Sequence, residues 1–459
     1  MPNLKRVLII TYYWPPSGGS GVQRWLKFAK YLPENGWQPV IYTPSNPEMP
    51  SVDESLLADI PPEAEIVTRK IFEPYSAYKR VMGMKQDAQI NTGFLSEEEK
   101  PGKLEEVMRW IRGNFFIPDA RKYWIKPSVR FLKKYLKDHP VDAIISTGPP
   151  HSMHLIALAL RQQLGIRWVA DFRDPWTNID FYADLHLSKK ADAKHRKLEK
   201  QVLSWADKVL VIGPTMQAEF NELLLHTPVQ EDRTNHGNKV VVIPNGFDAE
   251  DVHAGLDEKR AAAGSDERSA AGSANLPTTT STTPLDPFFT IAHIGSFSPA
   301  RNVPQLWKAI AAACEQDAYF KEKLRVKVVG KLDASVRKSI EEAGIADRLI
   351  QIPYLPHDEV MAEQRKSHVL LLIVNRSKNA KGILTGKIFE YLVAERPILA
   401  IGPPQGDLDY LLQEVGAGEV INWDEITPEH LLALKDAKAK GNAANYSRKV
   451  LCGEVVEML

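Results

Sequence analysis

Short apolar runs alternate with amphipathic segments along most of the chain, and this alternation constrains the fold most. Apolar runs at Arg6–Tyr12 and Val141–Ser146 are followed by helical patterns at Val22–Leu32 and His151–Leu164. Strands that alternate with helices in this way pair in parallel, and helices cover both faces of the sheet. Val209–Ile212 is apolar without interruption, as expected for a strand buried on both sides. The first half of the chain therefore predicts an α/β domain with a doubly wound parallel sheet.

The alternation stops between Ala254 and Pro287, where Ala, Gly, Ser and Thr predominate. This stretch has almost no large apolar side chain, so burial cannot offset the entropy cost of ordering it, and we predict a flexible insertion. The alternation resumes at Phe288–Ile294 and continues to Pro397–Ile401, which predicts a second doubly wound domain. The predicted organisation is a domain at 1–250, the insertion at 251–287, a domain at 288–440 and a terminal helix at 441–459.

Composition excludes several classes of protein. The 58 basic and 58 acidic residues cancel, so no global field favours nucleic acid, and no nucleic-acid partner is expected. Two cysteines are too few for a disulfide scaffold and suit a reducing compartment. The N-terminus carries no targeting signal, and no run of about 18 apolar residues predicts a membrane-spanning helix. A cytoplasmic protein is therefore expected.

A glycine-rich turn joins the first predicted strand to the first helix. Gly18 and Gly19 lie in this turn, where glycine lets backbone amides approach a phosphate. The third glycine of a dinucleotide fingerprint is missing, and the second strand ends in Thr43 and Pro44 rather than an acidic residue, which argues against NAD. An anion-contacting loop and a plain tight turn both fit this pattern.

Two other strand ends in the first half carry candidate functional residues. His151 follows the strand Val141–Ser146, and Arg173 follows the strand that ends at Asp171. In open parallel sheets, ligands bind beyond the carboxyl ends of the strands. The structural alternatives are a His151 that caps a helix or packs in the core, and an Arg173 that pairs with a neighbouring aspartate.

The second half carries a denser group of candidates. Gly295 ends a strand, and Arg301 follows it near a helix start. Thr385 is a candidate N-cap, and Lys387 and Glu390, three residues apart, share one helix face. A cation and an acid at a helix start suit a phosphate together with a hydroxyl-rich ligand. A simple salt bridge between Lys387 and Glu390 is the alternative.

No metal site is expected. Asp407 and Asp409 form a D-x-D pair, the pattern with which some sugar transferases bind a metal ion, but they precede a helical pattern, and a capping role is favoured. The 12 histidines are scattered, and no other cluster has the spacing of metal ligands.

One segment has a local charge excess. Residues 100–138 contain eleven Lys or Arg against four Asp or Glu, interleaved with aromatic residues. Such a surface suits anionic lipid headgroups or a diphosphate-bearing acceptor. The solvated faces of core helices would have the same composition, so both interpretations stay open.

The chain resembles family-4 (group 1) glycosyltransferases of the GT-B architecture. The motifs that carry the resemblance are Pro15–Gly19 after the first strand, Val242–Asp248 at the domain junction, and Lys387–Pro397. The stretch Asp171–Trp176 is similar to a subgroup that builds bacterial surface polysaccharides. The resemblance covers nearly the whole chain except the insertion.

The resemblance implies two facing Rossmann-like domains with an interdomain cleft, and a terminal helix that crosses back to the first domain. It implies a retaining, metal-independent sugar transfer from a nucleotide-diphosphate sugar to a glycan or lipid-linked acceptor. The nucleotide sugar is then a co-substrate, and no cofactor is required. A lipid-linked acceptor would place the enzyme at the inner face of the plasma membrane, where residues 100–138 are the expected contact.

The resemblance also implies roles for individual residues. Glu390 would bind the ribose, and Arg301 would lie near the diphosphate with Gly295, Thr385 and Lys387. Gly18 and Gly19 would form the loop of the first domain that approaches the phosphates. His151 and Arg173 occupy strand ends where the family places sugar-binding or catalytic groups.

The chain departs from the family pattern at two positions. Gly382 replaces the first acidic residue of the acid-x7-acid motif, and Ser296 replaces the usual Arg after the strand-end glycine. Lys387 is the candidate for the missing positive charge. Two alternatives stay open. One is a nucleotide-sugar epimerase or phosphorylase of the same architecture, and the other, which the two departures motivate, is a non-catalytic sugar-nucleotide-binding protein.

Overall fold

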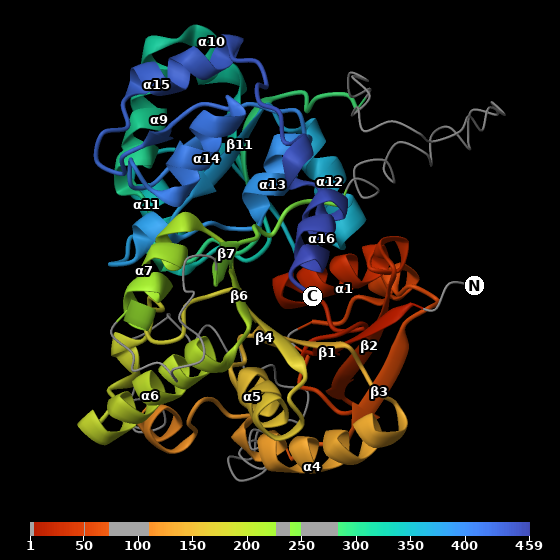
Figure 1. The fold of residues 1–459 in the computed structure, drawn as a ribbon. Coiled ribbons are helices and arrows are strands. Elements are labelled where there is room, and N and C mark those ends of the chain that lie inside the picture. Colours follow the sequence, from red (N-terminus) through yellow and green to blue (C-terminus); the bar gives the residue numbers. More distant parts are fainter. Residues whose placement is uncertain (1–3, 50, 73–109, 226–238, 249–282) are drawn as a thin grey trace, which may run out of the picture. The chain divides into compact units, whose positions relative to one another are not determined.

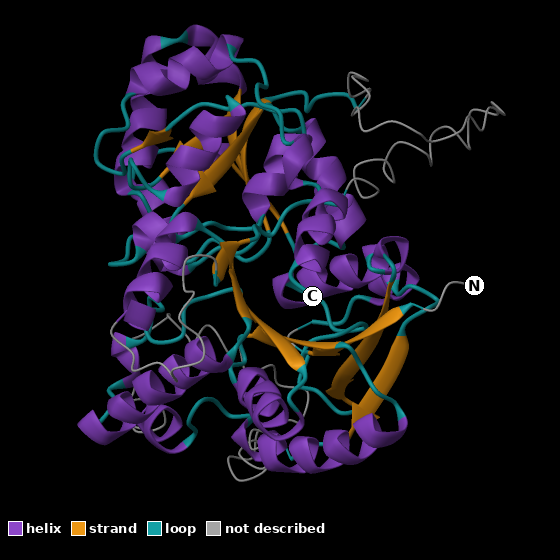
Figure 2. Cartoon of the chain, viewed as in Figure 1, coloured by secondary structure: helices purple, strands orange, loops and turns teal. Residues whose placement is uncertain are grey.

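The computed structural model describes residues 4–49, 51–72, 110–225, 239–248 and 283–459 (Figures 1 and 2). The chain forms two compact units. The first contains Met1–Pro244 together with Lys449–Leu459, and the second contains Asn245–Arg448. Most of the predicted insertion at 251–287 lies outside the described residues, which resume at residue 283.

The first unit is built on a sheet of seven parallel strands in the order β3-β2-β1-β4-β5-β6-β7. The strand order reverses between β1 and β4, and the carboxyl ends of strands at such a point are where open α/β sheets bind ligands. The strands are β1 (Lys5–Ile10), β2 (Trp37–Pro44), β3 (Glu65–Arg69), β4 (Ala143–Gly148), β5 (Arg167–Phe172), β6 (Lys208–Val211) and β7 (Val240–Val242).

Helices cover both faces of this sheet, because the side chains of each strand alternate between two cores. Val7 and Ile9 of β1 belong to one core, and Leu8 and Ile10 belong to the other. The first face carries α1 (Ser20–Tyr31) and the terminal helix α16 (Arg448–Glu457). The second face carries α4 (Lys122–Asp138), α5 (Ser152–Leu164), α6 (Lys189–Trp205) and α7 (Pro214–Leu225).

The second unit repeats this plan with six parallel strands in the order β10-β9-β8-β11-β12-β13. They are β8 (Phe289–Ile294), β9 (Leu324–Val329), β10 (Leu349–Ile352), β11 (Val369–Ile373), β12 (Ile398–Ile401) and β13 (Val420–Ile421). One face carries α9 (Pro304–Gln316), α10 (Ala318–Lys323), α11 (Ala334–Glu342) and α15 (Pro428–Leu432). The other carries α12 (His357–Lys366), α13 (Lys387–Val393) and α14 (Asp407–Val415).

The predicted fold class, α/β with two doubly wound Rossmann-like halves, is confirmed. Two strands were not predicted. β3 is an edge strand in which only Val67 is buried, and β13 has two residues, so neither forms an apolar run. Among the described residues, no helix combines the length and apolar character needed to cross a bilayer.

Candidate active site

The two predicted glycines of the first unit have different surroundings. The amide of Gly18 donates to the Ser51 carbonyl at 2.9 Å, and a Cβ on Gly18 would lie 2.6 Å from Ser51 Oγ. A larger residue at position 18 would therefore collide with the chain segment at Ser51. Gly19 is exposed, has a φ of 94°, and would leave its Cβ in open space. Of the two, Gly19 is the one whose backbone faces solvent.

Arg173, which directly follows β5, reaches the start of α1 after this glycine turn. Its Nη1 donates to the Gly21 carbonyl at 2.9 Å, and its Nη2 donates to the Pro149 carbonyl. Its buried Nε has no hydrogen-bond partner among the described residues, and burial lowers the pKa of the guanidinium. A Cβ on Gly21 would lie 3.1 Å from Nη1, so this glycine permits the close approach of the arginine.

Asp171 does not form the local Arg–Asp pair that the sequence left as an alternative. Its carboxylate pairs with Arg24 of α1, with 2.8 Å between Arg24 Nη2 and Asp171 Oδ1, and both side chains are buried. Trp25 Nε1 donates to the same carboxylate at 2.7 Å and Thr147 Oγ1 at 2.8 Å. Burial alone would raise the pKa of Asp171, but Arg24 and these donors hold it below its ordinary value. The pair fixes α1 against the end of β5.

His151 is a buried, neutral histidine at the start of α5. Its ring stacks on Trp176, with centroids 4.6 Å apart and planes 1° from parallel. Burial lowers its pKa well below the ordinary value, and the neighbouring His154 and Arg173 lower it further. Its buried Nδ1 has no hydrogen-bond partner among the residues described.

Asp119 supplies the cap of α5 that His151 does not. The Asp119 carboxylate accepts hydrogen bonds from the amide and the hydroxyl of Ser152, each at 2.8 Å. The α5 N-terminus is therefore satisfied by an acidic residue of the same chain.

A buried group on α6 holds Trp176 under the His151 ring. Trp176 Nε1 donates to His195 Nδ1 at 3.0 Å, which leaves the proton of neutral His195 on Nε2, facing the Gly113 carbonyl. One turn further along, Glu199 accepts hydrogen bonds from the amide and the hydroxyl of Thr177. No sequence pattern indicates this group, because histidine and glutamate on a mostly polar helix are usually solvated.

In the second unit, the Lys387 ammonium lies against the backbone of Gly295, at the end of β8. Gly295 has a φ of 102°, and a Cβ there would overlap Lys387 Nζ. Burial and, to a smaller extent, the charge of nearby Arg301 lower the pKa of Lys387, Glu390 opposes both effects, and the result is a pKa of about 7. No described residue accepts a hydrogen bond from this ammonium or forms an ion pair with it, so the predicted alternative of a Lys387–Glu390 salt bridge is not found.

Arg301 and Lys387 reach adjacent backbone residues, Ser296 and Gly295, and the charge of Arg301 contributes to the lowered pKa of Lys387. Arg301 Nη1 donates to the Ser296 carbonyl at 2.9 Å, and Nε donates to Asn375 Oδ1 at 3.0 Å. Asn375 follows β11, the neighbour of β8 in the sheet. Three of the predicted residues, Gly295, Arg301 and Lys387, are therefore brought together at the carboxyl ends of these strands.

Glu390 lies in the first turn of α13, and its Oε2 accepts a hydrogen bond from Gln364 Nε2 at 3.1 Å. Within the described part of the chain, no donor reaches its other oxygen. Thr385 lies just before this helix, with Gly386 in the N-cap position, and the Lys387 amide approaches Thr385 Oγ1 at 3.4 Å. Gly382, where the family pattern has an acidic residue, ends a short 3₁₀ turn at Ala380–Gly382.

The D-x-D pair is engaged with the backbone. Asp409 Oδ2 accepts from the Gln405 amide at 2.8 Å, and Oδ1 accepts from the Val420 amide at 3.0 Å. Both Asp407 and Asp409 are buried in the first turn of α14. In the ranges that the structure describes, no group of three or more His, Cys, Asp or Glu could hold a metal ion.

The basic, aromatic segment divides between core and surface. Residues 100–109 lie outside the described residues. Trp124 of α4 is buried and stacks on Tyr42, with centroids 5.2 Å apart. Trp110, Phe115 and Tyr123 are 43%, 58% and 48% exposed. Part of the segment is therefore core, as the second interpretation expected, and part presents aromatic side chains to solvent.

Comparison with known proteins identifies the family. Residues 19–251 match the model of Glycosyltransferase Family 4, which is half of the chain. This chain belongs to glycosyltransferase family 4. It is therefore an enzyme of the glycosyltransferase class, with the two Rossmann-like units of the GT-B fold. A comparison with curated proteins gives no significant match.

Solved structures share the fold at low identity. A trehalose-6-phosphate synthase, OtsA, is 14% identical with a TM-score of 0.56, over 98% of this chain and 95% of that one. The lipopolysaccharide outer core galactosyltransferase WaaB is 12% identical with a TM-score of 0.51, over 99% and 98%. A Listeria monocytogenes protein described as a UDP-N-acetylglucosamine 2-epimerase is 11% identical with a TM-score of 0.50, over 99% and 95%. At these identities the likeness concerns the fold alone.

Proposed function

We propose that this glycosyltransferase binds a nucleotide-diphosphate sugar on its second unit and transfers the sugar, with retention and without a metal ion, to a glycan or lipid-linked acceptor. The structures that share this fold include a trehalose-6-phosphate synthase and a lipopolysaccharide outer core galactosyltransferase, and the saccharide acceptor is proposed by analogy with them. The proposal includes that this enzyme takes part in the assembly of a surface polysaccharide.

The observation that carries the proposal is the Lys387 ammonium beside Gly295. Lys387 is partly buried, and a cation withdrawn from part of its water without a partner of opposite charge is stabilised when an anion binds it. Arg301 adds a second cation next to it. Two adjacent cations at the carboxyl ends of parallel strands suit a diphosphate. Lys387 thereby supplies the charge that Ser296 lacks in the family pattern.

Glu390 completes the donor site. Its Oε1 is open to hydroxyl donors, while Gln364 holds Oε2. A carboxylate accepts hydrogen bonds from the vicinal hydroxyls of a ribose, and the family resemblance assigns it this role. The diphosphate would then lie near Gly295, Arg301 and Lys387, with Thr385 at the start of the same helix.

The proposed reaction breaks the bond between the sugar C1 and the β-phosphate oxygen. A new bond forms between C1 and the acceptor hydroxyl oxygen on the same face of the sugar, which gives retention. The hydroxyl proton goes to the departing β-phosphate oxygen, so no side chain needs to accept it. Arg301 and Lys387 would stabilise the negative charge that develops on this phosphate.

On the first unit, Gly19, Arg173 and His151 are the proposed contacts of the reacting groups, with Gly18 keeping the turn tight. The unpartnered Nε of Arg173 suits a phosphate or sugar oxygen. A neutral His151 can accept a hydrogen bond from a sugar hydroxyl or donate one to it, without placing a charge next to Arg173.

The exposed aromatic residues Trp110, Phe115 and Tyr123, with Lys122 among them, support a peripheral membrane contact through 100–138. Aromatic and basic side chains together favour the headgroup region of a bilayer. A lipid-linked acceptor at the inner face of the plasma membrane would then be within reach of a cytoplasmic enzyme.

A panel of UDP-, GDP-, ADP- and dTDP-sugars, followed by thermal unfolding, tests donor binding. We expect one nucleotide class to raise Tm in the wild type and to lose this effect in Lys387→Ala. Product analysis with and without an acceptor then separates the alternatives. A transferase needs the acceptor, whereas an epimerase converts the donor alone. If no nucleotide sugar raises Tm, the proposed function is wrong.

A further inference from the structure

Gln364 is a fully buried polar side chain that contacts Glu390, the residue proposed to bind the ribose. It lies in the last turn of α12 with an exposed fraction of 0%. Its Nε2 donates to Glu390 Oε2 at 3.1 Å, and its Oε1 has no hydrogen-bond partner among the described residues. A buried amide that leaves its carbonyl unsatisfied costs free energy, so packing alone does not account for a glutamine at this position.

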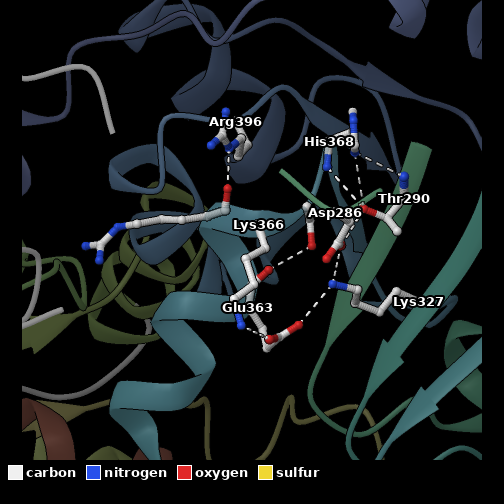
Figure 3. A network of polar contacts seen from close by, with 9 residues as sticks. Asp286, Thr290, Lys327, Glu363, Lys366, His368 and Arg396 are labelled. Carbon is white, nitrogen blue, oxygen red and sulfur yellow. Dashed lines mark hydrogen bonds and ion pairs between the residues drawn. The ribbon is translucent and has the colours of Figure 1, made fainter. Parts of the chain in front are cut away.

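The turn that carries Gln364 is anchored on the side facing β9 (Figure 3). Glu363 accepts from Lys327 Nζ at 2.9 Å and from Lys366 Nζ at 2.7 Å. Lys327 is almost fully buried and also pairs with Asp286, so Figure 3 shows its ammonium between the two carboxylates. The ion pair with the buried Lys327 fixes the position of Glu363, and the backbone of Gln364 is fixed with it.

Two further contacts hold the same turn. Arg396, which follows α13, donates from Nε to the Arg365 carbonyl at 2.7 Å, and the Asp286 amide donates to the Lys366 carbonyl at 2.9 Å (Figure 3). The helices α12 and α13 are therefore joined at two points, the Gln364–Glu390 contact and the Arg396–Arg365 contact.

This anchoring has a consequence for Glu390. A glutamate side chain has several rotamers, and ordering it on ligand binding costs conformational entropy. A donor on a fixed turn orders the carboxylate before the ligand arrives and leaves Oε1 free to accept. Pre-ordering of this kind improves affinity for the group that the carboxylate binds, and not for the rest of the ligand.

We propose that Gln364 is a positioning residue that orients Glu390 toward the ribose 2′- and 3′-hydroxyls, and that this orientation lets Glu390 distinguish ribonucleoside from 2′-deoxyribonucleoside diphosphates. The inference rests on the proposed function, which places the nucleoside at Glu390. Gln364 itself does not touch the nucleotide.

The test compares ribo- and deoxyribonucleotides in the wild type and in Gln364→Met. UDP, ADP and GDP are titrated by calorimetry, and the one that binds is compared with its 2′-deoxy form. We expect the wild type to prefer the ribonucleotide by about tenfold or more, since a site built to bind a hydroxyl discriminates against its absence. In Gln364→Met this preference falls to within about threefold, while the affinity for the 2′-deoxy form changes by less than about twofold.

Methionine has a similar length and removes the unsatisfied carbonyl, so we expect Gln364→Met to fold with an unchanged or higher Tm. Gln364→Leu provides the same comparison if the methionine variant does not fold. Gln305→Met is the matched control, because Gln305 of α9 also donates one hydrogen bond, to the Ile426 carbonyl at 3.2 Å, without contacting Glu390. The control should keep the wild-type preference.

Three outcomes overturn the inference, and they are distinguishable. If both Gln364 variants keep the wild-type preference, Gln364 does not position Glu390, and the proposed function stands. If ribo- and deoxynucleotides weaken equally, Gln364 has a structural role only. If the wild type binds neither form, or binds both equally and Glu390→Gln changes nothing, then Glu390 does not bind the ribose. In that case the proposed function is wrong, and the inference about Gln364 is wrong with it.

Discussion

Arg24 and Asp171 lie 147 positions apart in the chain and form an ion pair with 2.8 Å between Arg24 Nη2 and Asp171 Oδ1. Both side chains are buried, and the same guanidinium donates to the carbonyls of Ile243 and Pro244 at the end of β7. One arginine on α1 thus joins the ends of two strands. Arg173, two residues after Asp171, is left to contact the glycine turn instead.

The first prediction concerns this pair. Asp171→Asn keeps the shape of the side chain but leaves the Arg24 charge buried without a counter-ion, and we expect a loss of about 3–5 kcal/mol in the free energy of unfolding. Urea denaturation followed by circular dichroism measures it. Arg196→Ala, which removes an exposed ion pair with Asp192 on α6, is the control and should cost less than about 1 kcal/mol. A similar small loss for Asp171→Asn would contradict the prediction.

The pair also sets a limit on acid stability. Because the pKa of Asp171 in the folded state lies below its ordinary value of 3.8, its contribution is fully present above that value and is lost as the pH falls through the folded pKa. The difference between wild type and Asp171→Asn should therefore be constant from about pH 5 to 8 and shrink below about pH 4. A difference that shrinks between pH 5 and 8 would assign the effect to another group.

The sheets could be predicted from the sequence, whereas several contacts of the site could not. Strands such as β9 and β11 are continuous apolar runs, and the position of Arg301 and Lys387 follows from the rule that ligand groups gather at the carboxyl ends of parallel strands. The nearest candidate partner of Asp171 in sequence was Arg173, but the partner is Arg24. Sequence proximity cannot identify a pair that forms only when α1 packs on the sheet.

The burial of Gln364 has a signal in the sequence. It follows the buried Met361 by three positions on α12, so it occupies a place on the apolar face of that helix. A polar residue at such a place indicates a buried hydrogen bond. The partner, Glu390, lies 26 positions away on another helix and depends on the tertiary structure.

The second prediction concerns metal ions. Both carboxylate oxygens of Asp409 accept hydrogen bonds from backbone amides, so binding a metal would compete with the bonds from Gln405, just before α14, and from Val420 of β13. We expect turnover to survive EDTA and to be unchanged by added Mn²⁺. Asp409→Asn should lower Tm, because one amide loses its acceptor, without a specific loss of donor affinity. Loss of activity in EDTA with recovery in Mn²⁺ would refute the metal-independent mechanism.

The third prediction concerns Glu390. Glu390→Gln keeps the shape of the side chain but removes the charge and brings an amide group against Gln364. We expect nucleotide affinity to fall by about 2 kcal/mol, roughly thirtyfold, with Tm unchanged in the absence of ligand. Calorimetric titration of both proteins measures the effect. Glu419→Gln, at an exposed carboxylate in the same unit, is the control and should bind as the wild type does.

The fourth prediction concerns the pH dependence of donor binding. Lys387 has a pKa of about 7 in the ligand-free enzyme, because burial and Arg301 disfavour its charge. A bound diphosphate favours the charged form and raises this pKa, so binding takes up a proton above pH 7. Affinity should therefore be highest below pH 7 and fall by up to about tenfold per pH unit above it, until the pKa of the complex is reached.

A nucleotide sugar is the ligand for this measurement, because a terminal phosphate titrates near about pH 6 and would add its own pH dependence. Lys387→Met has no group to protonate, so its affinity should be weaker and constant between pH 6 and 9. Lys338→Met, at an exposed lysine of α11, should keep the wild-type profile. A wild-type affinity that is equal at pH 6 and 9, or an equal decline in Lys387→Met, would show that this ammonium does not meet the diphosphate.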